Sequence, residues 1–283
     1  MSTSASSSAQ QARQAIAAAL REIRADARLT ARELASQAGW DRTKVSHLEN
    51  ARRAPSADDI RTWCRICGAE DQAADLIASQ RAAKGMWIEW RRMERNGLRH
   101  SQQAILPLFE RTRMFRAYSC WVIPGMLQTE GYTRAILRAV AERRGLADDV
   151  EDAVKVRMDR QRLLRRGGRT FSFLVEESTL RTGLGGRGVM AEQLDHLIEL
   201  AALPSVSLGI VPARLDRDGA RPVEDFWIFD SEQVSVELVS GYLTVTHPRE
   251  VAMYAQVFGA LGEVAAYGPQ ARSLIEAAAQ SLG

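Results

Sequence analysis

Residues able to contact nucleic acid gather in one stretch of this chain, Thr30 to Pro55, which reads TARELASQAGWDRTKVSHLENARRAP. Within it, Arg42, Thr43 and His47 follow Asp41, a residue type that commonly caps a helix N-terminus. The major groove of DNA admits one α-helix, and Arg, Thr and His side chains can hydrogen-bond base edges there. We therefore predict base contacts from Arg42, Thr43 and His47.

Further polar and basic residues surround these three side chains. Phosphate contacts give affinity and register but little sequence information, and lysine and arginine carry the charge that they need. The residues predicted to contact the DNA backbone are Lys44, Ser46, Asn50, Arg52 and Arg53. The first 68 residues hold 11 Lys plus Arg against 7 Asp plus Glu, so the basic excess lies with this stretch. That imbalance is mild, and alone it does not indicate nucleic acid.

Two short helices joined by a tight turn are predicted to position these residues. Thr30 followed by Glu33 has the spacing of a capping box, which begins the first helix. The second helix is predicted over residues 42–50. Its apolar residues Val45 and Leu48 lie three apart and face the first helix, which leaves the polar side chains outward. The alternative interpretation is a helical hairpin that only packs and has solvated charges.

This stretch, extended to LTARELASQAGWDRTKVSHLENARRAPS, resembles the helix-turn-helix of the phage-repressor (Cro/CI, or XRE) family. In that family the recognition helix ends in a serine-x-leucine-glutamate-x-glycine pattern followed by basic residues and proline. The matching residues here are Ser46, Leu48, Glu49, Arg52, Arg53 and Pro55. The resemblance implies the same base and backbone contacts. In two departures, Ala31 stands where such proteins often have a phosphate-binding glutamine, and Ala51 replaces the usual glycine.

Length and composition indicate a globular protein. With 283 residues, 46% of them hydrophobic, the chain is long enough for two domains. The segment before Arg13 has no charged residue, so it lacks the basic flank of a signal peptide. No apolar run approaches the ~20 residues that span a bilayer. Three cysteines do not make a complete disulfide framework. We expect a cytoplasmic protein that does not associate with membranes.

Composition and helical periodicity divide the chain into four predicted segments. They are a disordered tail at 1–11, a helix-turn-helix DNA-binding domain at 12–69, a linking helix at 70–99, and a C-terminal regulatory or partner-binding domain at 100–283. In the linking helix, Trp87 and Trp90 are expected to pack on one domain or on a second subunit, or simply to fill a core.

The C-terminal segment mixes strand and helix patterns. Strands are predicted near 115–121 and at 171–175, 206–211, 225–229, 234–239 and 242–246. Helices are predicted from Thr129 and over 148–166, 189–203, 248–266 and 269–281. The predicted fold class is therefore α+β multidomain: an all-α helix-turn-helix bundle, a linking helix, and a C-terminal α+β domain with a mixed, largely antiparallel sheet.

A second resemblance covers this C-terminal segment. VIPGMLQTEGYTRAIL, RMDRQRLL, EESTLR followed by VMAEQLDHL, and the spacing that begins at VSVELVSGYLTV are similar to actinobacterial regulators of the WhiJ and antitoxin-like kind. In these proteins a phage-repressor helix-turn-helix precedes the second domain. Members are often paired with a small neighbouring protein thought to bind the larger one. The resemblance implies a transcription regulator whose second domain receives a signal or a partner.

Two motifs could suggest a metal or a cofactor. Cys64 and Cys67 form a C-x-x-C, but no second ligand pair accompanies them, which favours two core cysteines. Gly183, Gly185 and Gly188 satisfy G-x-G-x-x-G. The segment EESTLRT separates them from the preceding strand, and the next elements do not read as half of a dinucleotide-binding fold. A flexible loop is therefore favoured.

Four acidic and histidine residues could suggest a hydrolase or a metal site, namely Glu176, Glu177, His196 and His247. Their spacing matches no nucleophile elbow or zinc-protease motif. We expect no catalytic residues, no cofactor, no metal site and no enzymatic activity.

A Pro-Gly turn in the C-terminal segment is a better candidate for binding. It carries apolar residues near a tryptophan, which suits part of an apolar pocket or a partner-binding surface. The candidate residues are Trp121, Pro124, Gly125, Met126, Leu127 and Gln128. A buried turn without a binding role is the equal alternative.

These observations favour a sequence-specific DNA-binding transcription regulator whose C-terminal domain senses a partner protein or ligand. A homodimer on double-stranded DNA is expected, because such modules usually read two half-sites about one helical turn apart. One alternative is an antitoxin-like interaction protein that sequesters a small partner protein and autoregulates its operon. The other is a small-molecule-sensing repressor.

Overall fold

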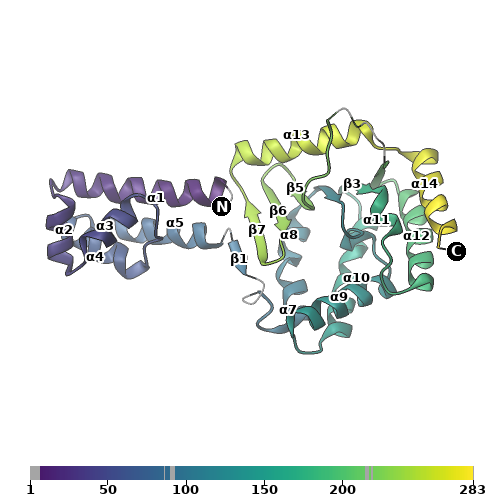
Figure 1. Ribbon diagram of the computed structural model, residues 1–283, viewed down its shortest axis with the longest axis horizontal. Helices are drawn as coiled ribbons and strands as arrows, with labels where there is room; N and C mark the ends of the chain where they lie inside the picture. Colours follow the sequence, from purple (N-terminus) through teal and green to yellow (C-terminus); the bar gives the residue numbers. More distant parts are fainter. Residues whose placement is uncertain (1–6, 86, 90–92, 214–216, 218, 283) are drawn as a thin grey trace. The chain divides into compact units, whose positions relative to one another are not determined.

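In a computed structural model, the chain forms two compact units that divide between Ile88 and Glu89 (Figure 1). The structure describes residues 7–85, 87–89, 93–213, 217 and 219–282. The first unit is a helical bundle, and the second combines helices with a mixed sheet. The predicted α+β multidomain class is therefore confirmed.

The first unit packs its helices around one hydrophobic core. Its elements are α1 (Ser7–Asp26), α2 (Ala31–Ala38), α3 (Arg42–Glu49), α4 (Ala57–Cys67), the 3₁₀ turn η1 (Glu70–Gln72) and α5 (Ala73–Gly85). Leu20, Leu34, Leu48 and Trp63 are fully buried in this core. The indole N–H of Trp63 donates to the carbonyl of Leu20 at 2.9 Å, so α4 is held to α1 by a buried polar contact as well as by apolar packing.

The predicted disordered tail at 1–11 is wrong over residues 7–11, because α1 already begins at Ser7. This serine- and alanine-rich segment continues the helix, and alanine is the residue with the highest helix propensity. The rest of the predicted tail, residues 1–6, lies outside the described residues.

A single linking helix over 70–99 is also wrong. Ile77 of α5 is buried in the first core, so α5 belongs to the bundle, and the short strand β1 (Trp87–Glu89) lies where the chain passes between the units. The boundary predicted between residues 99 and 100 falls inside the second unit, within α7 (Gly97–Ala104). There the Asp149 carboxylate accepts backbone N–H groups of Leu98 and Arg99 at 3.0 and 2.9 Å, so a residue about 50 positions away caps the helix. The side chains of Trp87 and Trp90 lie outside the described residues.

The second unit is built on a mixed sheet whose strands follow the order β7-β6-β5-β2-β3-β4. These strands are β2 (Met114–Ser119), β3 (Thr170–Glu176), β4 (Val206–Val211), β5 (Phe226–Phe229), β6 (Gln233–Glu237) and β7 (Gly241–Val245). The β2–β3 and β3–β4 ladders are parallel, and the β2–β5, β5–β6 and β6–β7 ladders are antiparallel. The strands predicted from the sequence correspond to these six.

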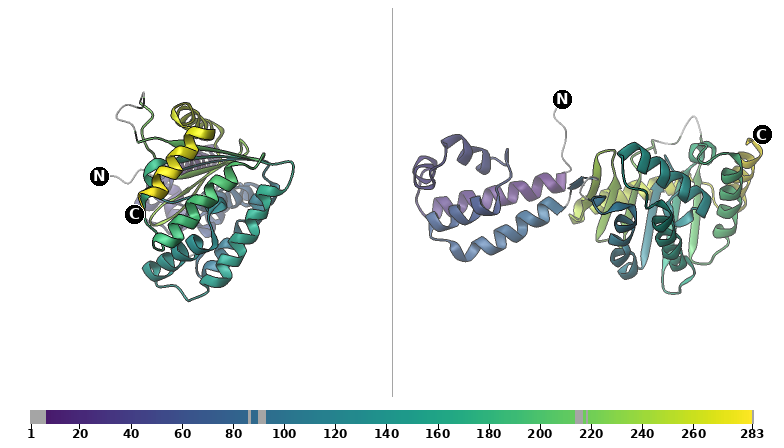
Figure 2. Two further views of the ribbon diagram at one scale, coloured as in Figure 1. Left: turned by 90° about the vertical axis from the view of Figure 1, so that its right-hand side faces the viewer. Right: turned by 90° about the horizontal axis from the view of Figure 1, so that it is seen from below.

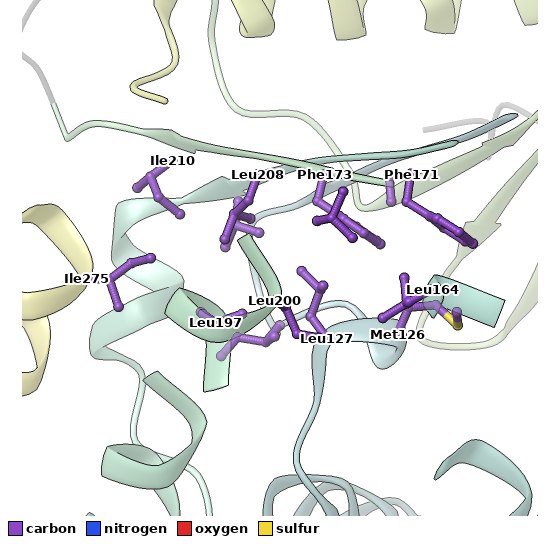
Figure 3. Packing of buried hydrophobic residues seen from close by; sticks show 14 of the residues in the cluster. Met126, Leu127, Leu164, Phe171, Phe173, Leu197, Leu200, Leu208, Ile210 and Ile275 are labelled. Atoms are coloured by element: carbon purple, nitrogen blue, oxygen red, sulfur yellow. The ribbon is translucent and has the colours of Figure 1, made fainter. Parts of the chain in front are cut away.

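Helices cover both faces of this sheet (Figures 1 and 2). They are α7, α8 (Leu106–Arg111), the 3₁₀ turn η2 (Gly125–Leu127), α9 (Glu130–Arg144), α10 (Val150–Gln161) with the 3₁₀ turn η3 (Arg162–Arg165), α11 (Glu177–Arg181), α12 (Arg187–Ala201), α13 (Pro248–Val264) and α14 (Gly268–Gln280). Helix α13 packs along one face, across strands β2 to β6. On the other face, α8, α9, α12 and α14 enclose the largest core with η2 and η3, where Phe115 stacks on Phe171 at 4.5 Å between ring centroids (Figure 3).

The glycine-rich loop between α11 and α12 lies in a parallel β–α–β crossover from β3 to β4. From the sequence, no parallel crossover was expected around this loop. Gly185 has a φ of 75°, and a Cβ there would lie 2.9 Å from the Cβ of Ala135 and 3.0 Å from a methyl group of Val189. A side chain at this position would both strain the backbone and clash with α9 and α12. Packing therefore explains Gly185 without a bound phosphate.

Candidate functional site

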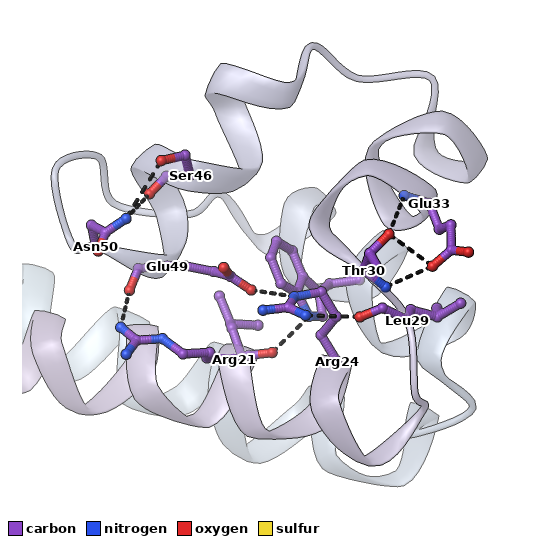
Figure 4. Close-up of polar contacts among 10 residues, drawn as sticks. Arg21, Arg24, Leu29, Thr30, Glu33, Ser46, Glu49 and Asn50 are labelled. Atoms are coloured by element: carbon purple, nitrogen blue, oxygen red, sulfur yellow. Dashed lines mark hydrogen bonds and ion pairs between the residues drawn. The ribbon is translucent and has the colours of Figure 1, made fainter.

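The two helices predicted over residues 30–50 are α2 and α3, and local hydrogen bonds set their ends (Figure 4). Thr30 Oγ1 accepts the backbone N–H of Glu33 at 3.2 Å, and the backbone N–H of Thr30 donates to Glu33 Oε2 at 2.7 Å. This is the predicted capping box, which satisfies two N–H groups at the start of α2. Gly39 ends α2 with a φ of 65°, which an L side chain rarely adopts.

Helix α3 presents one polar face to solvent and one apolar face to the bundle. The Asp41 carboxylate caps it by accepting the Thr43 N–H at 2.6 Å, and Val45 and Leu48 are fully buried. Arg42, Thr43 and Ser46 are exposed, while His47 is partly buried. The structure therefore places the three predicted base-contacting residues on the first two turns of one helix, where Arg42 and Thr43 are exposed.

Ionic and hydrogen-bonded contacts hold the end of α3 on α1 (Figure 4). Glu49 is buried, and its carboxylate pairs with Arg24 Nε at 2.5 Å. Arg21 donates to the Glu49 carbonyl at 2.5 Å, and Arg24 also donates to the Leu29 carbonyl at 2.7 Å. These contacts fix the orientation of α3 relative to α1, which a helix that reads base edges requires.

Lys44, one of the predicted backbone contacts, has a partner within the bundle. Its ammonium group forms an ion pair with the carboxylate of Asp59 on α4 at 2.6 Å and lies 3.9 Å from the centre of the Trp40 ring. The charge of Lys44 therefore compensates a buried carboxylate, while the side chain stays partly exposed. In this structure Lys44 connects α3 to α4.

The other predicted backbone-contacting residues lie at the C-terminal end of α3 and in the loop after it. Asn50 is exposed, and its amide donates to the Ser46 carbonyl at 2.8 Å. Ala51 has a φ of 53°, so the position where the phage-repressor pattern has glycine keeps the left-handed backbone at a cost of about 1–2 kcal/mol. Arg52 and Arg53 are exposed, which leaves both cations available to phosphate groups.

Cys64 and Cys67 belong to the bundle core, as the sequence favoured. Cys64 is fully buried in α4, and Cys67 packs beside the same core. Burial raises the pKa of Cys64, and it raises the pKa of Cys67 to about 11, so both thiols stay protonated and unreactive at neutral pH. Among the described residues, no group of three His, Cys, Asp or Glu side chains is placed to hold a metal ion.

The second unit contains a cavity of about 320 Å³ that lies entirely within it. Its walls come from α7, α8, α9 and α10, from the segment between β2 and α9, and from strands β5 to β7. Two arginines of α10, Arg157 and Arg160, line it three residues apart on one face of that helix.

Arg160 is buried, with 6% of its surface exposed, and its guanidinium lies over the Phe109 ring at 4.7 Å. Within the described residues, its Nε and Nη1 atoms have no hydrogen-bond partner. Burial, with the neighbouring charge of Arg157, lowers the pKa of Arg160 to about 9. Leaving a buried charge without a counter-ion typically costs several kcal/mol. A residue kept under such conditions is a candidate functional residue.

Arg157 is held in place by two amide side chains and by no carboxylate. Its Nε donates to Gln102 Oε1 at 3.1 Å, and its Nη1 donates to Gln128 Oε1 at 2.9 Å. Burial lowers its pKa, as it does for Arg160. Across the described residues, no carboxylate lies within ion-pair distance of either arginine.

The Pro-Gly turn proposed as a binding site divides between this cavity and the core. The residues that line the cavity are Trp121, Pro124, Gly125 and Gln128. Met126 and Leu127 are fully buried on the other side of the turn, among the residues packed against β3 (Figure 3). Four residues of the turn therefore line a cavity, and the other two belong to the core.

The acidic and histidine residues weighed for catalysis lie at three separate places along the chain. Glu176 is buried and receives Arg217 through two bonds of 2.9 and 2.7 Å and the Tyr118 hydroxyl at 2.8 Å. Glu177 accepts the backbone N–H of Ala213 at 3.0 Å. His196 lies on α12, and His247 precedes α13.

Comparison with known families follows the same division into two units. Residues 103–277, more than half of the chain, match the model described as a domain of unknown function, DUF5753. The chain belongs to the DUF5753 family. Residues 15–77 match a helix-turn-helix domain, which spans most of α1 and continues into α5. This DUF5753 protein therefore carries a DNA-binding module at its N-terminus. Comparison with curated proteins gave no match.

A solved structure with partial similarity is that of TrmBL2, an archaeal chromatin protein described as showing a novel mode of DNA binding. It is 14% identical to this DUF5753 protein, with a TM-score of 0.33, over 75% of this chain and 69% of the other. At that similarity the comparison bears on neither the fold nor the function.

In the described part of the chain, no helix is long and apolar enough to cross a membrane.

Sequence reasoning did not single out the two cavity arginines of the DUF5753 domain. The signal lies in the predicted helix over 148–166, where Val150, Ala153 and Val154 form the buried stripe. Arg157 continues that stripe at helical spacing, and Arg160 follows one turn later. Arginines in register with an apolar helix face are an unusual pattern, because arginine is almost never fully buried unless it is paired.

Proposed function

We propose that this DUF5753 protein is a sequence-specific transcription regulator of the phage-repressor type, whose second domain senses a partner protein or ligand. The main support is the geometry of α3, whose polar face is exposed while Val45 and Leu48 anchor it and Arg24 holds Glu49 at its end. A rigidly held helix with exposed Arg42 and Thr43 suits the major groove.

Within this proposal, Arg42, Thr43 and His47 discriminate bases, and each good contact contributes about 1–3 kcal/mol. Ser46, Asn50, Arg52 and Arg53 fix the register on the backbone. We further propose that the protein acts in the cytoplasm as a homodimer on two half-sites, and that it regulates by binding and catalyses no reaction. The exposed cations after α3 are consistent with this role, since phosphate contacts supply most of the non-specific affinity.

The proposal is tested by fluorescence anisotropy of the intact protein on DNA from its own upstream region, with a shuffled duplex of equal length as control. Tight binding to the first duplex and weak binding to the second are expected. Equal weak binding to both would contradict a site-specific regulator and would favour a protein whose main task is to bind a partner protein.

Two classes of variant separate the proposed roles. Arg42→Ala should reduce discrimination at one base pair by about 1–3 kcal/mol. Arg52→Ala should weaken binding to all sequences alike and reduce the salt dependence. If Arg42→Ala lowers affinity equally for every sequence, Arg42 contacts the backbone and the assignment is wrong.

A further inference from the structure

The cavity of the second unit places two positive charges, buried Arg160 and partly buried Arg157, beside apolar side chains. Arg160 has two guanidinium nitrogens without a hydrogen-bond partner within the described residues, and the Arg157 guanidinium donates there to the neutral amides of Gln102 and Gln128. An arginine guanidinium is planar and presents paired N–H groups that match a carboxylate or a phosphate in bidentate geometry. The chemical complement of this pair is therefore an anion.

The carboxylates that line the same cavity do not form ion pairs with Arg157 or Arg160 within the described residues. Glu94 is buried and paired with Arg144 of α9. Asp225 accepts the backbone N–H of Cys120 at 2.7 Å, and burial raises its pKa to about 6. Glu237 is exposed and outside ion-pair distance of both arginines, although its charge acts on them. The nearest acidic groups thus have other partners or remain in solvent.

The arginines are positioned by residues that hold their side chains in one geometry. Gln128 is buried, and its amide donates to the Ile123 carbonyl at 2.7 Å while its oxygen accepts Arg157. Phe109 supports the face of Arg160. A ligand would meet guanidinium groups that are already oriented, which lowers the entropy lost on binding.

Apolar side chains form part of the remaining walls of the cavity, beside polar ones such as Ser101, Ser119 and Ser235, and further apolar residues lie exposed at its rim. Leu98, Ile105, Ile136 and Trp227 line the interior, and their burial suits a hydrocarbon or aromatic body. At the rim, Trp121 is 70% exposed and Val239 is 93% exposed. An exposed apolar patch beside a cavity is one of the features that mark ligand-binding grooves.

We propose that this cavity binds a small organic anion, whose carboxylate or phosphate group meets Arg157 and Arg160 and whose apolar body packs against Phe109, Ile105 and Trp227. The site rests on the proposed function in one respect, since it names the class of ligand that the second domain senses. Binding itself does not depend on DNA. The cavity volume of about 320 Å³ lies at the lower end of the range for small-molecule sites, which favours a compact ligand.

The test is calorimetry on the full chain, without DNA, against indole-3-acetate, decanoate, phenyl phosphate and inorganic phosphate. At least one of the three organic anions is expected to bind with a Kd below about 1 mM. Its neutral counterpart, for example indole-3-acetamide, should bind at least about tenfold more weakly, because it loses the charge-assisted contact. The carboxylate and phosphate probes distinguish the two head groups, and inorganic phosphate alone measures the contribution of the charge.

Two variants test the arginines separately, and one serves as a matched control. Arg160→Met and Arg157→Gln should each remove the preference for the anion over its neutral counterpart. The control is Arg162→Gln. Arg162 lies on the next turn with 83% of its side chain exposed, so its replacement should leave anion binding unchanged. Arg160→Met should keep or raise the melting temperature of the free protein, because it removes an unpaired buried charge.

The proposal is overturned if none of the organic anions binds below about 1 mM, or if acid and amide bind alike. It is also overturned if Arg160→Met lowers the melting temperature while Arg157→Gln keeps the anion preference, since both arginines would then be structural. DNA binding, measured on the same preparations, separates the two proposals. Anion binding without specific DNA binding removes only the regulator, and specific DNA binding without anion binding removes only the ligand site.

Discussion

Replacing Lys44 with methionine tests whether this residue serves the bundle or the DNA. Sequence reasoning placed Lys44 among the backbone contacts, whereas the structure pairs it with Asp59 at 2.6 Å and sets it over Trp40. Methionine keeps most of the apolar stem and removes only the charge. The Lys44→Met variant should therefore lose stability and keep its salt-dependent affinity for DNA.

The expected loss in the free energy of unfolding follows from how exposed the Lys44–Asp59 ion pair is. An exposed ion pair contributes about 0–1 kcal/mol, and breaking a buried one costs about 3–5 kcal/mol. The side chains of Lys44 and Asp59 are 23% and 10% exposed, so the pair lies between these limits. Asp59 keeps the backbone N–H of Ser56 at 2.9 Å, which moderates the loss. With about 0.5–1 kcal/mol from the contact over Trp40, we expect a loss of about 2–3 kcal/mol.

The pH at which the protein unfolds in acid gives an independent test of the Lys44–Asp59 ion pair. Burial raises the pKa of Asp59, but hydrogen bonds from Lys44 and Ser56 outweigh it and hold the pKa below its ordinary value of 3.8. When folding lowers the pKa of a carboxyl group, that group stabilises the folded state at pH values above its pKa in the unfolded state. This stabilisation is lost as the pH falls through its pKa in the folded state. In Lys44→Met the pKa of Asp59 rises, so unfolding in acid should begin at a higher pH.

The assay combines calorimetric unfolding with DNA titrations at several salt concentrations. For a domain of this size, 2–3 kcal/mol corresponds to a drop of about 10–15 °C in the melting temperature of the first unit. At a temperature where the variant is folded, the slope of log affinity against log salt should match that of the unaltered protein. Arg52→Ala, the control, should reduce that slope by about 0.9 for each bound protomer at unchanged stability. A Lys44→Met protein with unchanged melting temperature and a slope reduced by about 0.9 for each bound protomer would refute the reasoning.

Three further outcomes are expected. Ala51→Gly should stabilise the first unit by about 1 kcal/mol in urea unfolding, because Ala51 holds a φ of 53°; a loss of stability would mean that the side chain packs usefully. Gly185→Ala should destabilise the second unit by about 1–3 kcal/mol, since a Cβ would lie 2.9 Å from that of Ala135, and an unchanged melting temperature would contradict the packing argument. Asp225→Asn should raise the melting temperature at pH 8 and not at pH 4, because burial raises the pKa of Asp225 to about 6 and its charge opposes folding above that pH. Equal effects at both pH values would show that this charge does not matter.

Local sequence signals determined the helix-turn-helix almost completely. The Thr30–Glu33 capping box, the Asp41 cap and the spacing of Val45 and Leu48 predict α2, α3 and the buried face between them, and the structure contains all of these. Each signal acts within a few residues, where hydrogen-bond geometry and the helical repeat leave little freedom. The strands of the second unit were predictable for the same reason.

Tertiary structure decided which polar side chains are available for binding. Lys44 and Arg52 look alike in sequence, yet one pairs with a carboxylate from α4 and the other is exposed. Likewise, Asp149 caps α7 from about 50 residues away, and Arg157 and Arg160 meet the apolar walls of a cavity only when helices and strands distant in sequence come together. Periodicity places a residue on a face of its own helix, but the partner on the opposing element, and with it the burial and charge of the site, follows from how the elements pack.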